Sequence, residues 1–293
     1  MATIFNGLHG PNRALSTETY AIIDNGHYTS IKLLEIHGCQ HSVAEAKECL
    51  KRGATNLMLR LPDSRRPDGS YPAYAEYADT CLALIHSWYQ KVGCLYFQVD
   101  NEPNWQWMYQ HYGPGDYQWF MKRAMQIIRQ QIPSGVKLVC PPLSFASVMF
   151  NHDAQNPSPY TLNEWHAAYD YDDHGAEPSL WHFFDVMGAN SYWRESKDMA
   201  DPSLGKSYYE VYLWAGQIAP VCVLEWGSTI GETGSYTAHE LEMMRCSQYP
   251  QWIEAAKATG VVDRCYCWLS PTTTPDWYGD QLSVGAVHCL SHL

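Results

Sequence analysis

Short apolar runs of strand type alternate with amphipathic segments of helical type from end to end of the chain. The strand-type runs are rich in β-branched and aromatic residues, and the segments between them repeat apolar residues at helical spacing. This alternation favours parallel strands joined by helices, because parallel neighbours need a long crossover connection. Strands are expected at residues 3–8, 31–36, 55–61, 95–99, 136–140, 184–192, 220–227 and 264–269. The pattern therefore predicts the α/β class and a single (β/α)8 barrel, the TIM-barrel fold.

The length of the chain fits one domain of this kind. α/β barrels often run to 293 residues undivided, and no charge block, internal repeat or Gly/Ser-rich linker marks a boundary. We therefore expect a single catalytic domain over residues 1–293. Local signals also place helix starts: Ser42 and Glu45 form a capping box, and Asp116 could cap the helix that follows. Thr237 and Glu240 form a second capping box.

Composition narrows the class of partner. A formal charge of −12 argues against nucleic acid and anionic membranes, and the absence of a long apolar run argues against a transmembrane helix. The chain has 12 Trp and 21 Tyr, which is more than a core needs and suggests stacking surfaces for flat apolar ligand faces. We expect a neutral carbohydrate substrate, and a protein that is a monomer or a weak oligomer.

The sequence leaves the compartment open. The N-terminus lacks the charged start and apolar run of a signal peptide, so the protein is expected to be cytoplasmic or secreted with its signal removed. Buried reduced thiols that act as small hydrophobes are expected in or beside the strands, at Cys94, Cys140, Cys222, Cys265 and Cys267. Cys39 and Cys49 could instead form disulfides if the protein is extracellular.

Two expected strands end in polar residues. The run 95–99 leads into Asp100, Asn101 and Glu102, and the following Pro103 blocks further ladder pairing. Far downstream, the strand 220–227 carries Glu225 near its end. Because the C-terminal ends of barrel strands present the chemistry of this fold, two such carboxylates suggest acid/base and nucleophilic work on a glycosidic bond. The alternative is that each glutamate is a solvated loop residue.

At Asn101-Glu102-Pro103 and Leu224-Glu225-Trp226-Gly227 the sequence resembles clan A of the retaining glycoside hydrolases, the 4/7 superfamily. In that clan the acid/base follows an Asn at the end of barrel strand four, and the nucleophile ends strand seven. The strand count made from the alternation alone places Glu102 on the fourth strand and Glu225 on the seventh. The resemblance covers the barrel and identifies a clan without identifying a sugar.

The resemblance implies roles for residues of this chain. Glu102 would be the general acid/base, Glu225 the nucleophile, and Asn101 the partner of the sugar 2-hydroxyl. Tyr192 looks like the tyrosine that contacts the nucleophile, and Trp268 like the platform beneath the sugar. Substrate binding is expected from Asn101, Arg60, Asn190, Tyr192, Trp268, Trp105 and Trp226. The clan often has His where Asn190 stands, and its Arg comes more usually from strand two than from the third strand, where Arg60 lies.

The retaining mechanism explains these residue types. Two carboxyls about 5–5.5 Å apart allow one to attack the anomeric carbon while the other protonates the leaving oxygen. The nucleophile must be ionised, which hydrogen bonds from Tyr192 and a nearby Arg60 would favour, whereas the acid must stay protonated near neutral pH. A bell-shaped pH–rate profile governed by Glu102 and Glu225 is therefore expected.

Other residues leave two interpretations open. Trp105, Trp107, Tyr109 and Tyr112 could form further sugar subsites or pack their loop onto the barrel. His9 and Asn12 could reach the cleft floor or pack the barrel end. His37, Cys39 and His41 lack the fuller ligand set of a zinc site, so neither metal nor cofactor is expected.

The sequence thus favours a retaining β-glycoside hydrolase that acts on a neutral β-linked oligo- or polysaccharide by double displacement, most simply as an endo-acting glycanase. An exo-acting β-glycosidase is the nearest alternative. A carbohydrate-binding barrel without turnover is a second, and a metal-dependent barrel lyase or isomerase a third. The last would need more convergent His, Asp and Glu ligands than the expected strand ends supply.

Overall fold

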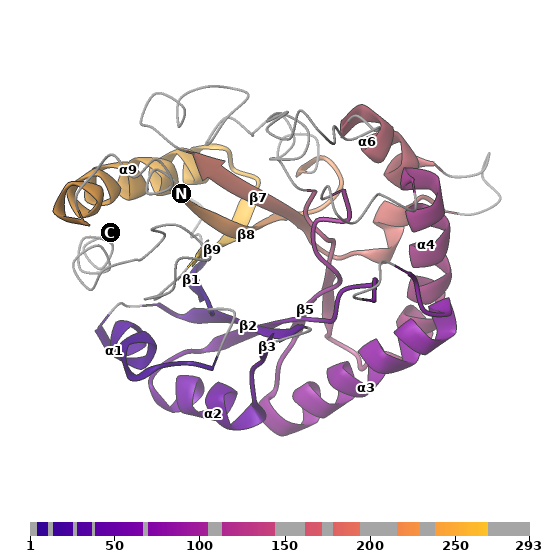
Figure 1. Ribbon diagram of the computed structural model, residues 1–293, viewed down its shortest axis with the longest axis horizontal. Helices are drawn as coiled ribbons and strands as arrows, with labels where there is room; N and C mark the ends of the chain where they lie inside the picture. The colour runs from indigo at the N-terminus through magenta and orange to yellow at the C-terminus, as the bar shows by residue number, and fades with distance from the viewer. Residues whose placement is uncertain are drawn as a thin grey trace. The chain divides into compact units, whose positions relative to one another are not determined.

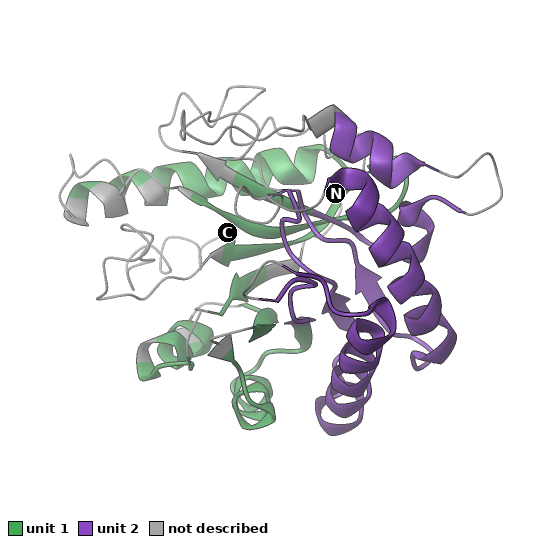
Figure 2. Ribbon diagram, turned by 45° about the vertical axis from the view of Figure 1, so that its right-hand side comes forward, with its two compact units in different colours: residues 1–58, 189–293 green, residues 59–188 purple. Residues whose placement is uncertain are grey.

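A computed structural model describes the protein at residues 5–10, 14–25, 28–36, 39–66, 70–104, 113–143, 162–171, 178–193, 216–228 and 238–268. The chain divides into two compact units (Figure 2). Unit 1 comprises Met1–Met58 and Ala189–Leu293, and unit 2 comprises Leu59–Gly188. The expectation of a single domain over residues 1–293 stays a prediction.

Unit 1 is built on parallel strands hydrogen-bonded in the order β2-β1-β9-β8 (Figure 1). The bounds are Phe5–His9 for β1, Ser30–Ile36 for β2, Val221–Ser228 for β8 and Val262–Trp268 for β9. Leu8 of β1 lies opposite Ile31 on one side and Cys267 on the other. A two-residue strand, β3 (Cys39–Gln40), pairs antiparallel with β2. The described residues of these parallel strands are mostly buried, as expected for strands covered on both faces.

Unit 2 contains the parallel strands β5 (Tyr96–Gln98) and β6 (Lys137–Val139), with Phe97 opposite Leu138. Val139 forms a parallel bridge with Val186, the residue before β7. Two strands, β4 (Asn56–Arg60) and β7 (Met187–Trp193), continue from one unit into the other along the chain.

The strand order is that of a (β/α)8 barrel. Hydrogen-bonded neighbours follow the order β6-β5-β4-β2-β1-β9-β8-β7, so that, apart from β3, neighbours in the sheet are consecutive in the chain and the first strand lies beside the last. Each expected strand overlaps one of these. The predicted fold class is therefore confirmed, with Glu102 after the fourth barrel strand and Glu225 on the seventh.

The described helices of unit 1 are α1 (Thr17–Asn25), α2 (Val43–Lys51) and α9 (Ala238–Ala258). The capping box predicted for α2 is confirmed, because the Glu45 amide donates to Ser42 Oγ at 3.1 Å and the Ser42 amide donates to the Glu45 carboxylate at 2.6 Å. Thr237, expected to begin α9, lies outside the described residues.

Replacing Ser42 with alanine is expected to lower the free energy of unfolding by about 1 kcal/mol, because an N-terminal amide of α2 loses its acceptor. Urea denaturation of both proteins measures the change. Ser247→Ala is the control: this exposed serine lies inside α9 and caps nothing, so its effect should stay within about 0.5 kcal/mol. Equal effects of the two variants would contradict the capping role.

The described helices of unit 2 are α3 (Tyr74–Val92), α4 (Pro114–Gln131) and α6 (Leu162–Asp170), with a short 3-10 helix, η2, at Leu180–Phe183. Asp116 caps α4 as expected, from a position inside the first turn. The helix begins after Gly113, and Asp116 accepts from the Gly113 amide at 3.1 Å. Proline is favoured at the first helical position because its missing N–H needs no partner there, so Pro114 sets the start.

Buried thiols behave as the sequence predicts. The described free cysteines are all buried, and they are Cys49, Cys81, Cys94, Cys140, Cys222, Cys265 and Cys267. Burial raises the pKa of Cys222 to about 12, which keeps this thiol protonated and unreactive. Cys246 is disulfide-bonded. Among the helices that the structure describes, none is long and apolar enough to cross a membrane.

Candidate active site

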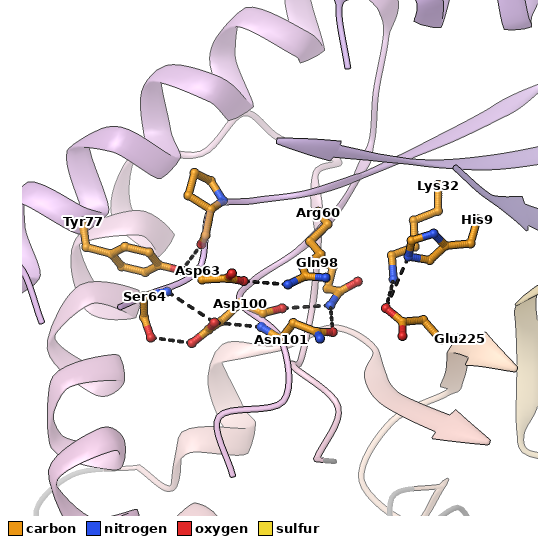
Figure 3. Close-up of polar contacts among 11 residues, drawn as sticks. His9, Lys32, Arg60, Asp63, Ser64, Tyr77, Gln98, Asp100, Asn101 and Glu225 are labelled. Carbon is orange, nitrogen blue, oxygen red and sulfur yellow. Dashed lines mark hydrogen bonds and ion pairs between the residues drawn. The ribbon is translucent and has the colours of Figure 1, made fainter. Parts of the chain in front are cut away.

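In unit 1 a buried cluster surrounds Glu225, which lies in the second half of β8 and is 5% exposed (Figure 3). Its Oε1 lies 3.3 Å from Nε2 of His9 and 3.3 Å from Nζ of Lys32. His9 ends β1, Lys32 lies in β2, and the two are register partners in these neighbouring strands. Because side chains of register partners in a parallel pair point to the same face, the strand register brings both basic groups to one carboxylate.

Lys32 is the cation of this cluster. The side chain is fully buried, and Nζ donates to the carboxylate of Glu225 and to the main-chain oxygen of Leu224 at 3.2 Å. A buried ammonium group is costly unless it is paired and hydrogen-bonded, and Glu225 supplies the opposite charge. The same pairing stabilises the ionised form of the Glu225 carboxylate.

His9 is neutral in this setting. Burial, and next the charge of Lys32, lowers the pKa of His9 to about 4. Nδ1 lies 2.6 Å from the main-chain oxygen of Gly10, which can only accept, so Nδ1 carries the ring hydrogen. The neutral ring then presents Nε2 to Glu225 without a hydrogen. A hydrogen bond between Nε2 and Oε1 therefore requires one further proton shared by the two groups.

In unit 2 the residues after β5 form a strained turn. Asp100 has φ 58° and Glu102 has φ 42°, both in the left-handed region that residues other than glycine rarely adopt. Such residues cost on the order of 1–3 kcal/mol each and persist where surrounding contacts over-determine them, often at functional sites. The Glu102 amide donates to the main-chain oxygen of Pro142 at 3.0 Å. This turn places Glu102 half-buried directly after the fourth barrel strand.

The buried carboxyl of Asp100 holds this turn (Figure 3). It accepts hydrogen bonds from the Ser64 hydroxyl at 2.5 Å, the Ser64 amide at 3.3 Å and the Asn101 amide at 2.8 Å. Burial, and next the charge of Asp63, raises the pKa of Asp100 to about 6. The group therefore titrates in a range where most aspartates are already ionised.

Asn101 is fixed by Gln98. The Gln98 side-chain nitrogen donates to Asn101 Oδ1 at 2.9 Å and to the main-chain oxygen of Asp100 at 2.8 Å. Since Oδ1 accepts this bond, the opposite side of the Asn101 amide presents its NH₂ donors. The side chain is 8% exposed. Such an amide is suited to donate to an oxygen such as a sugar hydroxyl.

Arg60 and Trp226 make contacts other than those expected of them. Arg60, at the end of β4, donates to the carboxylate of Asp63 at 2.7 Å within unit 2. Trp226 is fully buried, with its ring stacked on Trp252 of α9 at 4.5 Å between centroids and edge-on to Tyr249. The Trp226 ring therefore has no exposed face for a sugar, and its observed role is packing.

The remaining predicted residues are described in part. Asn190 is fully buried in β7. Tyr192 lies in β7 and Trp268 ends β9, but their side chains lie outside the described part of the structure. Trp105, Trp107, Tyr109, Tyr112, Asn12 and His37 also lie outside it. Within the part that is described, no three or more His, Cys, Asp or Glu side chains are grouped to hold a metal ion.

Sequence reasoning missed Lys32 and the Asp100–Ser64 contact. Lys32 interrupts the apolar run of the second strand, and a charged residue in a strand buried on both faces needs a partner. That signal could have pointed to a counter-charge on another strand. The chain carries no comparable signal for Ser64, which lies in a polar loop.

Comparisons with solved structures show the barrel. No protein-family model matches the sequence, and no curated protein matches it. A glucosidase from Croceicoccus marinus aligns with 100% of this chain and 68% of its own at 10% identity and a TM-score of 0.67. The endo-β-1,4-mannanase from Thermotoga petrophila aligns with 100% of this chain and 76% of its own, at 12% identity and a TM-score of 0.61. A monomeric β-xylosidase from Caulobacter crescentus CB15 aligns with 99% of this chain and 67% of its own, at 12% identity and a TM-score of 0.59.

The chain has a (β/α)8-barrel fold. The structural neighbours are glycoside hydrolases, so the resemblance expected from the two glutamate motifs is confirmed at the level of the fold. Alignments at 10–12% identity show a shared fold only. The reaction must therefore be argued from the site residues of this chain.

Proposed function

We propose that the protein is a retaining glycoside hydrolase that cleaves neutral β-linked oligo- or polysaccharides. The observation that carries the proposal is Glu225, a buried carboxylate on the seventh barrel strand paired with the fully buried Lys32. A carboxylate stabilised in this way is ionised and oriented, as a nucleophile must be. The strained turn that presents Glu102 after the fourth strand supports the second role, because strained backbone clusters at functional sites.

In the first step the Glu225 carboxylate attacks the anomeric carbon while Glu102 gives its proton to the leaving oxygen. A covalent glycosyl ester forms on Glu225 as the glycosidic bond breaks. In the second step water attacks the same carbon, its proton passes to Glu102, and Glu225 leaves as a carboxylate. Lys32 and His9 both contact Oε1 of Glu225, so we assign the attack to Oε2.

Other residues have supporting roles in this proposal. Lys32 supplies a cation beside the nucleophile, the role expected of Arg60, and it lies on the second barrel strand. Asn101 donates to the sugar 2-hydroxyl through its NH₂ group. Sugar contacts are proposed for Tyr192, Trp268 and Trp105, as the clan resemblance implies. Trp226 packs the barrel, and Asn190 is fully buried in β7.

Endo action is favoured by the aromatic residues after the fourth strand, and exo action remains the second candidate. The structural neighbours include a glucosidase, a β-xylosidase and an endo-mannanase. The test is hydrolysis of aryl β-glycosides and of β-glucan, mannan and xylan, with the products resolved by chain length. Internal cleavage supports endo action, and release of single sugars supports exo action. Tight sugar binding with no turnover on any substrate would contradict the proposal and favour a binding protein.

Glu102→Ala is expected to lower kcat/KM by about 10²–10⁴-fold on oligosaccharides, whose leaving oxygen needs a proton. Aryl glycosides with acidic phenols should lose much less, because their leaving group departs without protonation. Initial rates on both substrate types measure the difference. Glu76→Ala, which removes an exposed glutamate of α3 paired with Arg66, should change neither rate. The same loss on both substrate types would exclude an acid role for Glu102.

A further inference from the structure

The strained backbone after β5 must be held by contacts with neighbouring groups of the chain. Asp100 and Glu102 both occupy the left-handed region, and neither is glycine. Backbone in this region relaxes unless neighbouring groups over-determine it. Pro142 accepts the amide of Glu102, and Gln98 donates to the main-chain oxygen of Asp100 and to Asn101 Oδ1. The Asp100 carboxyl accepts the Asn101 amide and also binds Ser64, so it joins the turn to a neighbouring loop.

We propose that Asp100 is a positioning residue that holds the Asn101–Glu102 turn through its carboxylate, and that its protonation weakens this hold. The inference rests on the proposed function, in which Glu102 is the acid/base. The carboxylate ties the turn to the loop after β4, because it binds the Asn101 amide on one side and Ser64 on the other. Asp100 touches no substrate in this account and acts through Glu102.

The three hydrogen bonds are strongest to the ionised form. Both amides donate to Oδ1 and the Ser64 hydroxyl donates to Oδ2, and bonds to a charged acceptor are roughly twice as strong as neutral ones. A protonated Asp100 keeps Oδ1 as an acceptor, but its Oδ2–H must donate to the Ser64 hydroxyl, which turns from donor to acceptor. The contacts to both amides lose their charge assistance, and the strained backbone at Asp100 and Glu102 loses part of its support.

The groups that face Asp100 come from several elements of unit 2. Asp63 of the loop after β4 is the charged group that acts on it, and Asp63 is itself paired with Arg60. The titratable neighbours are Tyr71 of the same loop, Tyr77 and Cys81 of α3, Tyr117 of α4 and Tyr169 of α6. Burial raises the pKa of each of these tyrosines and of Cys81, so they stay uncharged around pH 6.

The expected consequence is an acidic limb near pH 6 in the pH–rate profile. The pKa of Asp100 is raised to about 6, so the carboxylate form prevails above this pH and is lost as pH falls through it. Activity should fall in the same range. Substitutions beside Asp100 that leave Glu225 unchanged separate this limb from a limb set by the nucleophile.

Two substitutions beside Asp100 should move the limb in opposite directions. Asp63→Asn removes a like charge, which stabilises the carboxylate and shifts the limb to lower pH. Ser64→Ala removes a hydrogen bond to the carboxylate and shifts the limb to higher pH. Asp100→Asn keeps the shape, brings an NH₂ group among donors, and should lower kcat by up to about 10²-fold with a smaller change in KM. Glu76→Gln removes one exposed negative charge of α3 and should leave the limb in place.

The experiment combines pH–rate profiles of these variants with a carboxyl-carbon NMR titration of the isotope-labelled full chain. We expect a carboxyl signal that titrates with a midpoint near pH 6 and is absent in Asp100→Asn. The midpoint should fall to lower pH in Asp63→Asn and rise to higher pH in Ser64→Ala. The backbone amides of Asn101 and Glu102 should follow the same transition. If the wild type hydrolyses no glycoside, the proposed function fails, but this titration still tests the positioning role. The positioning role would be overturned if the midpoint moved in the same direction in both variants. It would also be overturned if the amide signals of Asn101 and Glu102 did not change across the titration.

Discussion

Glu225→Ala is expected to lower kcat/KM by about 10⁴-fold or more, because removing the nucleophile of a covalent mechanism abolishes nearly all the chemical acceleration. Azide should restore turnover of aryl glycosides by entering the space that the carboxylate vacates. The product should then be the glycosyl azide of inverted anomeric configuration, which NMR distinguishes from the retained sugar formed by the wild type.

The control for this variant is Glu254→Ala. Glu254 is an exposed glutamate on α9 of the same unit, paired with Lys257, and its loss should leave kcat/KM unchanged. Retained activity in Glu225→Ala, or a loss that azide does not reverse on any aryl glycoside, would remove Glu225 from the nucleophile role.

Lys32→Met is expected to lower the free energy of unfolding by about 3–5 kcal/mol, since it breaks a buried ion pair by removing one of its two partners. Both side chains are buried, at 0% and 7% exposure, so water cannot replace the lost partner. Urea denaturation at pH 7 measures the change. Activity should fall as well, because the nucleophile loses the group that stabilises its ionised form.

The double variant Lys32→Met/Glu225→Gln separates pairing from packing. It removes both charges, so its free energy of unfolding should exceed that of Lys32→Met alone. Lys51→Met, at a lysine whose side chain is 79% exposed, should change stability by no more than about 0.5 kcal/mol. A double variant no more stable than Lys32→Met would show that the ammonium acts through packing rather than charge.

The fold could be predicted because its signals are local. Most barrel strands are short runs rich in apolar residues, and helices such as α3 and α4 repeat apolar residues on one face, so the alternation indicates the strand order. The capping box at Ser42 is likewise complete within four residues. The cap of α4 is local as well, because Asp116 and Pro114 both lie in the first turn and both favour a helix N-terminus there.

The site could be predicted only in part. Glu102 and Glu225 stand in short motifs at strand ends, so the chain itself points to them. The partners of Glu225 could not be read in this way, because Lys32 precedes it by 193 residues and reaches it through the registers of several strands. Arg60 was expected beside the nucleophile, but its described partner is Asp63, three residues away in its own loop.

The most direct test of the account is to trap the intermediate. The wild type would be incubated with a 2-deoxy-2-fluoro glycoside of the sugar that the substrate panel identifies, since the fluorine slows release of a covalent glycosyl enzyme. Intact mass and peptide mapping then locate the label. We predict one fluoroglycosyl group per chain, attached to Glu225. A label on another carboxylate, or turnover with inverted configuration and no label, would contradict the account.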